Sequence, residues 1–252
     1  MSVAASYVSR PDETRAGIIV PYDMALDREM WRWVPDGVSL MFTRTPFAAM
    51  PVTLDMAEVV GDEDAVEQCT RDLVTAVPAA FAYACTSGSF VHGTAGEKRL
   101  VETMSTVGQA AAVTSAGAML AALEHLGVRR IATATPYDAR VTERLTVYLE
   151  EAGFDVVSSA HLGLIGQIWT VPYEETLQLV READCDEADA VFVSCTNLAT
   201  YDVIAPLEAE LGKPVITANQ VTMWAMLDAI GRRAVGPRQW LLHGPPISRE
   251  DA

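Results

Sequence analysis

Residues 190–196, Ala-Val-Phe-Val-Ser-Cys-Thr, form an apolar run that ends in a polar turn, and the chain contains this pattern twice. The earlier copy is residues 79–86, Ala-Ala-Phe-Ala-Tyr-Ala-Cys-Thr. Neither run alternates between apolar and polar residues, which is typical of a strand buried on both faces of a parallel sheet. We therefore expect strands over 79–84 and 190–193, each ending at a cysteine.

Two further landmarks repeat in the same order around these runs. Val-Pro-Tyr-Asp at 20–23 returns as Thr-Pro-Tyr-Asp at 135–138, and Val-Thr-Ser-Ala at 113–116 returns loosely as Ile-Thr-Ala-Asn at 216–219. This order indicates an internal duplication. If the two halves pack about a pseudo-two-fold axis, one thiol from each half can meet in a single cleft.

Strand and helix signals alternate along the whole chain, which predicts an α/β fold with parallel strands and right-handed crossovers. Expected strands are 17–20, 38–42, 79–84, 111–113, 130–133, 154–157, 190–193 and 215–216. Expected helices are 62–77, 97–107, 116–126, 139–152, 174–183, 202–211 and 221–230. We predict two pseudo-symmetric Rossmann-like halves, each a four-stranded mostly parallel sheet with flanking helices. The first half is residues 16–115 with 220–240, the second is 116–219, and 1–15 and 243–252 are tails.

In such sheets ligands bind at the carboxyl ends of the strands. The candidate site residues predicted at that edge are Pro21, Tyr22, Asp23, Cys85, Thr86, Ser87, Thr114, Ser115, Tyr137, Cys195, Thr196 and Asn197. We expect them to surround an active site in the cleft between the halves.

The paired cysteines, Cys85 and Cys195, are the candidate catalytic residues. A single buried cysteine is well explained as a small apolar residue, but two at matching places in a duplicated unit favour chemistry. Helix N-terminal amides can lower a thiol pKa from about 8.5 toward neutrality. One thiolate could then attack or remove a proton while the other thiol donates one, and this chemistry calls for no cofactor.

Composition excludes several other classes of function. A formal net charge of −16 argues against binding nucleic acid or an anionic membrane surface. We find neither an apolar run long enough to cross a membrane nor a signal peptide, and we expect a cytoplasmic protein. The four cysteines have no zinc-ligand spacing, so we expect free thiols and no metal. The expected partner is a small carboxylate substrate, and a homo-oligomer is left open.

The same landmarks carry a resemblance to a known family. Residues 20–21, 84–85, 114–118, 126–132, 135–137, 194–195 and 212–215 are similar to the aspartate/glutamate racemase superfamily. Within it, the chain most closely resembles the branch of maleate cis-trans isomerases and arylmalonate decarboxylases, over about residues 16–240.

The resemblance implies roles for five residues. In the isomerases the first cysteine adds to the substrate double bond and the second transfers a proton at the neighbouring carbon, and these places correspond to Cys85 and Cys195. In the decarboxylases the first place is glycine, so Cys85 favours two-thiol chemistry. Tyr137 matches the tyrosine that binds a substrate carboxylate, whereas Thr86 and Ser87 match the decarboxylase pair that forms a dioxyanion pocket.

Two departures from the isomerase pattern concern the substrate. Residues 22–24 are Tyr-Asp-Met where isomerases carry Ser-Ser-Asn, and Asp23 would repel a dicarboxylate unless protonated, paired or turned away. Residues 161–166 follow the decarboxylase pattern and lack an isomerase asparagine.

The leading hypothesis is a cofactor-independent, maleate cis-trans isomerase-like enzyme acting on a small carboxylic or dicarboxylic acid. The alternatives are decarboxylation of a substituted malonate with Cys195 as proton donor, and a non-catalytic binding or pathway accessory protein.

Overall fold

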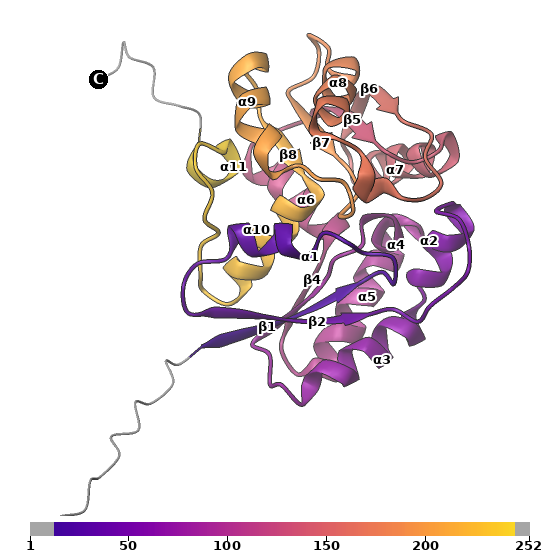
Figure 1. Ribbon diagram of the computed structural model, residues 1–252, viewed down its shortest axis with the longest axis vertical. Helices are drawn as coiled ribbons and strands as arrows, with labels where there is room; N and C mark the ends of the chain where they lie inside the picture. The colour runs from indigo at the N-terminus through magenta and orange to yellow at the C-terminus, as the bar shows by residue number, and fades with distance from the viewer. Residues whose placement is uncertain (1–12, 245–252) are drawn as a thin grey trace, which may run out of the picture.

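The computed structural model describes residues 13–244, which form two four-stranded parallel sheets (Figure 1). The strands are β1 (Thr14–Val20), β2 (Val38–Arg44), β3 (Ala80–Tyr83), β4 (Ala111–Thr114), β5 (Arg130–Thr135), β6 (Asp155–His161), β7 (Ala190–Val193) and β8 (Val215–Thr217). The strand orders are β2-β1-β3-β4 and β6-β5-β7-β8, and every pairing is parallel. The same topology therefore occurs twice, and the predicted α/β fold of two related halves is confirmed.

Helices cover both sheets (Figure 1). They are α1 (Asp27–Met30), α2 (Leu54–Val60), α3 (Glu63–Val74), α4 (Thr86–Phe90), α5 (Gly93–Gly108), α6 (Ser115–His125), α7 (Ala139–Glu151), α8 (Tyr173–Ala183), α9 (Tyr201–Leu211), α10 (Ala218–Ala229) and α11 (Trp240–His243), with 3₁₀ turns at Trp31–Trp33 and Ile168–Thr170. The seven predicted helices are all present. The prediction missed α1, α2, α4 and α11, because such short helices show too few apolar repeats to be recognised.

Side-chain caps fix where two of the predicted helices begin. The Asp62 carboxylate accepts a hydrogen bond from Ala65 N, and the Asp138 carboxylate accepts one from Val141 N. Each bond satisfies an amide that has no partner within the first helical turn. Helices α3 and α7 therefore start immediately after these aspartates.

Strand β1 shows why the central strands are apolar throughout. Ile18 and Ile19 point to opposite faces of the first sheet, and each is buried in a separate apolar cluster.

Strand β1 begins at Thr14, earlier than predicted, because Thr14 and Arg15 continue the parallel register with β2. These two residues therefore leave the predicted 1–15 tail, and His243 belongs to α11. Glu13 and Gly244 are described but belong to no helix or strand, and the remaining tail residues, 1–12 and 245–252, lie outside the described residues.

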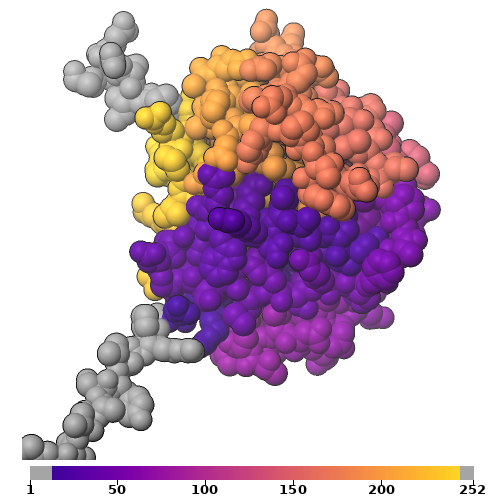
Figure 2. Space-filling view, in the orientation of Figure 1, coloured from indigo at the N-terminus to yellow at the C-terminus, as the bar shows by residue number. Residues whose placement is uncertain are grey.

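The two halves meet across the middle of the molecule, as the boundary between purple and orange atoms in Figure 2 shows. Helix α10 follows β8 in the sequence, yet it contacts β3, β4 and α6. This helix therefore packs against the first sheet, although it follows the last strand of the second sheet in the sequence. Within residues 13–244, no helix combines the length and the apolar composition that a membrane crossing requires.

Candidate active site

A small cavity at the carboxyl ends of β1, β3, β5 and β7 brings the two cysteines together. Its lining residues are Pro21, Asp23, Val52, Met56, Cys85, Thr86, Ser87, Tyr137, Ile168, Cys195, Thr196 and Asn197. The cavity has a volume of about 20 Å³, which is room for about one water molecule. A four-carbon acid is larger than this, so the lining must move before such a substrate can enter.

Three predicted site residues do not line this cavity and instead hold neighbouring elements. The Tyr22 hydroxyl donates to Met50 O at 3.2 Å. The Thr114 hydroxyl donates to Glu97 at 2.6 Å and accepts from the amide at the start of α6. The Ser115 hydroxyl pairs with the Thr222 hydroxyl at 2.7 Å.

Three lining residues were missed by the sequence analysis: Val52, Met56 and Ile168. Val52 precedes α2, Met56 lies in α2, and Ile168 begins a 3₁₀ turn. Val52 N also donates to Ile165 O at 2.8 Å, which joins the segments that carry two of these side chains. Isolated apolar residues outside the long periodic elements give no sequence signal for a ligand site.

Cys85 stands at the N-cap of α4, with φ at −141° in extended backbone. Its Sγ lies 3.9 Å from the Ser87 hydroxyl. A Cβ atom placed on Gly88 would clash with the Tyr83 hydroxyl and lie 3.2 Å from Cys85 Sγ. Only glycine at position 88 therefore allows the chain to pass this close to the thiol.

Cys195 has φ at +88°, in the left-handed region that non-glycine residues rarely adopt. Three contacts fix the turn: Asn197 N donates to Cys195 Sγ at 3.4 Å, the Thr196 hydroxyl donates to Ala84 O at 3.1 Å, and Asn219 Nδ2 donates to Thr196 O at 2.9 Å. Such backbone strain persists only where the surrounding structure holds it. The orientation of this thiol is thus set by contacts that also reach into the first half.

Burial has a larger effect on the pKa of both thiols than the helix amides have, and it raises that pKa. It raises the pKa of Cys85 to about 11, against the lowering effect of hydrogen bonds from Gly88 N and Tyr83. It raises the pKa of Cys195 to about 12, and the negative charge of Asp23 adds to the increase at both cysteines. The expectation of a lowered thiol pKa is therefore wrong for this closed cavity, and both groups are neutral proton donors at pH 7.

Asp23 is the one charged residue among those that line the cavity. Burial raises the pKa of its carboxyl group, while the charge of Arg44 lowers it. A dicarboxylate placed in the same cavity would meet this carboxylate without a lining cation to offset the repulsion.

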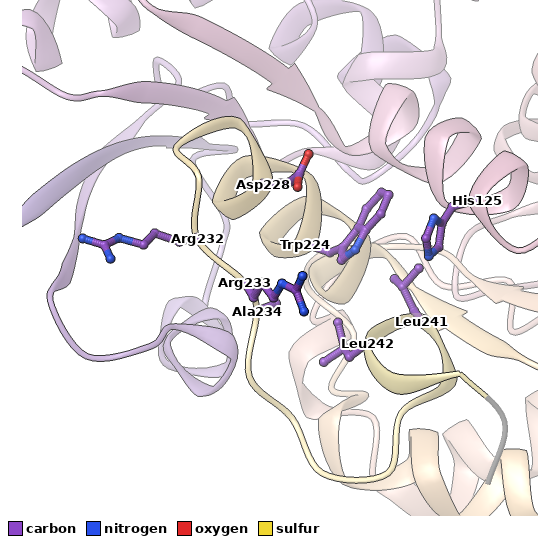
Figure 3. Close-up of a pocket in the computed structure, with 8 residues that line it drawn as sticks. All are labelled: His125, Trp224, Asp228, Arg232, Arg233, Ala234, Leu241 and Leu242. Atoms are coloured by element: carbon purple, nitrogen blue, oxygen red, sulfur yellow. The ribbon is translucent and has the colours of Figure 1, made fainter. Parts of the chain in front are cut away.

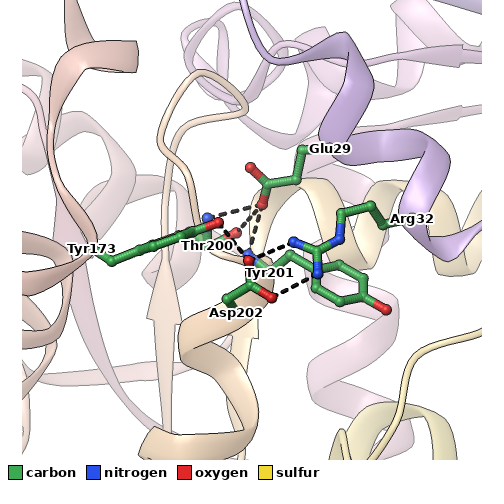
Figure 4. A network of polar contacts seen from close by, with 6 residues as sticks. All are labelled: Glu29, Arg32, Tyr173, Thr200, Tyr201 and Asp202. Carbon is green, nitrogen blue, oxygen red and sulfur yellow. Dashed lines mark hydrogen bonds and ion pairs between the residues drawn. The ribbon is translucent and has the colours of Figure 1, made fainter.

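A polar cluster at the start of α9 links the two halves (Figure 4). The buried Glu29 carboxylate, on α1, accepts from Thr200 N and Thr200 Oγ1 at 2.9 Å and from Tyr201 N at 2.8 Å. It therefore caps α9, whose first residues follow the Cys195 turn. Next to it, the Arg32 guanidinium binds both oxygens of Asp202 at 2.6 Å. The sequence analysis missed this cluster, because its partners lie about 170 residues apart in the sequence.

Hydrogen-bond donors in the cavity suit carboxylate oxygens. The Thr86 hydroxyl is buried and has no partner among the described residues. Ser87 and Tyr137, which also carry hydroxyl groups, line the same cavity. Within residues 13–244, no three His, Cys, Asp or Glu side chains are grouped as metal ligands would be. The arrangement can bind a carboxylate and exchange protons with the atom beside it.

Comparisons with known proteins place the chain in one family. The chain is 30% identical over 217 residues to the arylmalonate decarboxylase of Bordetella bronchiseptica, covering 82% of this chain and 87% of that protein. It is 30% identical over 179 residues to a maleate isomerase of Pseudomonas putida, covering 68% and 72%. A liganded arylmalonate decarboxylase in which one glycine is changed to cysteine and one cysteine to serine superposes with a TM-score of 0.84, at 26% identity, over 91% of this chain and 99% of that one. The sequence model of the arylmalonate decarboxylase family matches residues 17–239. This chain belongs to that family, in the branch that joins the decarboxylases with the maleate isomerases.

Proposed function

We propose that this protein is a cofactor-independent isomerase that acts on a small carboxylic acid through Cys85 and Cys195. The observation that carries the proposal is that one thiol from each half lines the same cavity. Isomerisation by proton and thiol transfer needs two such groups on one substrate, whereas a single proton donation needs only one.

For a cis-trans reaction on maleate or a close relative, Cys85 first loses its proton to water as the lining opens to admit the substrate, because the thiol is neutral in the closed cavity. It then reacts as its thiolate. Its sulfur bonds to one alkene carbon, and the electrons of the double bond move onto the carboxylate of the other carbon as an enediolate. The Cys195 thiol protonates that second carbon, and the central single bond rotates. Cys195 then takes the proton back, the double bond re-forms, and the carbon–sulfur bond breaks. The donors of Thr86, Ser87 and Tyr137 stabilise the enediolate.

A second candidate is decarboxylation of a substituted malonate, and the apolar side of the cavity favours it. Val52, Met56 and Ile168 offer a surface for an apolar substituent. In this reaction the bond to one carboxylate breaks, carbon dioxide leaves, and the electron pair forms an enediolate on the remaining carboxylate. Cys195 donates the proton to carbon, and Cys85 has no required role.

One set of assays separates these reactions. The protein is incubated with maleate or with phenylmalonate, and fumarate or phenylacetate is measured by proton NMR. For the isomerase we expect fumarate, with turnover reduced by about 10³-fold or more in both Cys85→Ser and Cys195→Ser. For the decarboxylase we expect phenylacetate, lost in Cys195→Ser and retained in Cys85→Ser.

The half-exposed Cys185 supplies the matched control, because Cys185→Ser removes a thiol outside the cavity. Circular dichroism confirms that each variant is folded. Failure of the wild-type protein to convert either acid would overturn the proposal in favour of a non-catalytic binding protein. Full turnover in both cavity variants would overturn it by showing that the two thiols do not carry the reaction.

A further inference from the structure

A second cavity has a volume of about 470 Å³, and Figure 3 shows the residues that line it. We call it the Trp224 pocket: its lining comes from the ends of α6 and α10, from residues 232–234 and from α11, and it includes His125, Trp224, Arg233, Leu241 and Leu242. It shares no lining residue with the cysteine cavity. Its volume is within the range of small-molecule sites, about 300–1,000 Å³.

One side of the Trp224 pocket is formed by aromatic and aliphatic side chains. The rings of His125 and Trp224 lie with centroids 5.4 Å apart, at an interplanar angle of 46°. Leu241 is buried and Leu242 is half-buried beside them. Aromatic and aliphatic side chains arranged in this way suit a planar ring, which gains from both stacking and burial.

The lining of the Trp224 pocket includes two arginines, although the chain as a whole is strongly acidic. Arg232 and Arg233 line the pocket with a single carboxylate, Asp228, although the chain carries a formal charge of −16. Within residues 13–244, neither arginine has an ion-pair partner. Figure 3 shows the Arg233 side chain beside Leu242 and Trp224, whereas Arg232 points away from them. Arg233 is therefore the group placed to receive an anion.

Hydrogen bonds to the rest of the protein hold residues 235–240, which connect two parts of the Trp224 pocket lining. Gln239, which is buried, accepts hydrogen bonds from Trp33 Nε1 at 2.8 Å and from Gln220 Nε2 at 2.9 Å. Trp240 N donates to the Glu208 carboxylate at 3.0 Å. Val235 N donates to Trp33 O at 2.8 Å. Because these bonds already hold the wall, a ligand would lose little affinity to ordering it.

We propose that the Trp224 pocket binds an aromatic monocarboxylate, separately from the reaction at the cysteines. The ring lies against Trp224 and His125, and the carboxylate binds the Arg233 guanidinium through two parallel hydrogen bonds. A neutral aromatic amide lacks the second acceptor oxygen and the charge, and it binds more weakly.

The test uses the full chain and 2-naphthoate as the probe, with binding measured by isothermal titration calorimetry. We expect saturable one-to-one binding that weakens about tenfold or more in both Arg233→Gln and Trp224→Ala, and that also weakens between 50 and 500 mM KCl, because salt screens the ion pair. Arg233 is exposed, so Arg233→Gln tests the charge without disturbing the core.

Arg129→Gln is the matched control, since Arg129 is also exposed but does not line the pocket. It should bind 2-naphthoate as the wild type does, and 2-naphthamide should bind the wild type more weakly. The proposal is overturned if no saturable binding occurs at millimolar probe, or if binding persists unchanged in Arg233→Gln and Trp224→Ala. The second result would assign the probe to another site, such as the cysteine cavity.

Discussion

The side-chain amide of Asn197 joins the two halves beside the cysteine cavity. Its Nδ2 donates to Asp23 O at 3.0 Å, and its Oδ1 accepts from Ala25 N at 2.9 Å. Asn197 is two residues after Cys195, and its partners follow β1 on the other side of the cavity. One amide therefore sets how the turn carrying Cys195 sits against the opposite wall.

Asn197→Ala should lower turnover by about 10²-fold, because a displacement of about 1 Å at a reacting group has effects of this size. It should also lower the free energy of unfolding by about 1–3 kcal/mol, since a backbone donor and a backbone acceptor lose their partner. Steady-state kinetics and urea unfolding measure the two effects. Gln68→Ala, which removes an exposed amide on α3, is the control and should change neither. Wild-type kinetics in Asn197→Ala would show that this link does not position Cys195.

Backbone conformation at the two cysteines predicts opposite responses to glycine. Glycine adopts positive φ without strain, so Cys195→Gly should be more stable than Cys195→Ala by about 0.5–1 kcal/mol. At Cys85 the φ of −141° is ordinary, so Cys85→Ala should be more stable than Cys85→Gly. Thermal unfolding of the four variants gives both differences, and each cysteine serves as the control for the other. The same order at both positions would contradict the assigned strain at Cys195.

Asp23 provides a test of the thiol electrostatics. Its negative charge raises the pKa of Cys85 and of Cys195, so Asp23→Asn should lower both and speed labelling by iodoacetamide at pH 8. Mass spectrometry of the labelled peptides follows each cysteine separately. In the wild type, labelling of both should rise about tenfold per pH unit, because each thiol is far below its pKa. Half-exposed Cys185 should be labelled first.

Asp36→Asn is the control, because Asp36 is exposed and outside the cavity. It should leave the labelling of Cys85 and Cys195 unchanged. Asp23→Asn should also lower the KM for maleate more than the KM for a monocarboxylate, because only the dianion places a second charge near residue 23. Equal labelling rates in the wild type and in Asp23→Asn would show that the Asp23 charge does not raise the pKa of either thiol.

Much of the fold can be predicted from the sequence because it depends on local patterns. The apolar runs of β3 and β7, and the aspartates that cap α3 and α7, act within a few residues of where they stand. The sequence also predicts that Cys85 and Cys195 line one cavity, because a duplicated topology brings equivalent strand ends together. The duplication therefore makes it possible to predict that two residues far apart in the sequence lie close together, which a single copy of the pattern would not allow.

The remaining features depend on tertiary contacts that no local pattern encodes. Val52 and Ile168 line the cavity from outside the long periodic elements, and Glu29 caps α9 from far away in the sequence. Nor could the sequence anticipate the raised thiol pKa values. A cysteine at a helix start predicts a lowered pKa, but α4 has only five residues, and burial outweighs its amides. Which effect wins depends on how tightly the cavity closes.

Glu208 predicts a pH dependence of stability that is independent of catalysis. Its buried carboxyl accepts hydrogen bonds from Val215 N and Trp240 N, yet burial raises its pKa from 4.5 to about 7. The folded protein therefore binds this proton more tightly than the unfolded chain does. The resulting stabilisation is fully present below pH 4.5 and is lost as the pH rises through 7.

The free energy of unfolding of the wild type, measured relative to that of Glu208→Gln, should accordingly fall by up to about 3 kcal/mol between pH 5 and pH 8.5. Urea unfolding at several pH values in this interval measures the difference, which cancels the other titrating groups common to both proteins. Glu182→Gln, which changes an exposed carboxyl group on α8, should show no comparable trend. A pH-independent difference for Glu208→Gln would mean that burial does not hold the proton there, and that the two amide donors keep the carboxylate charged throughout this range.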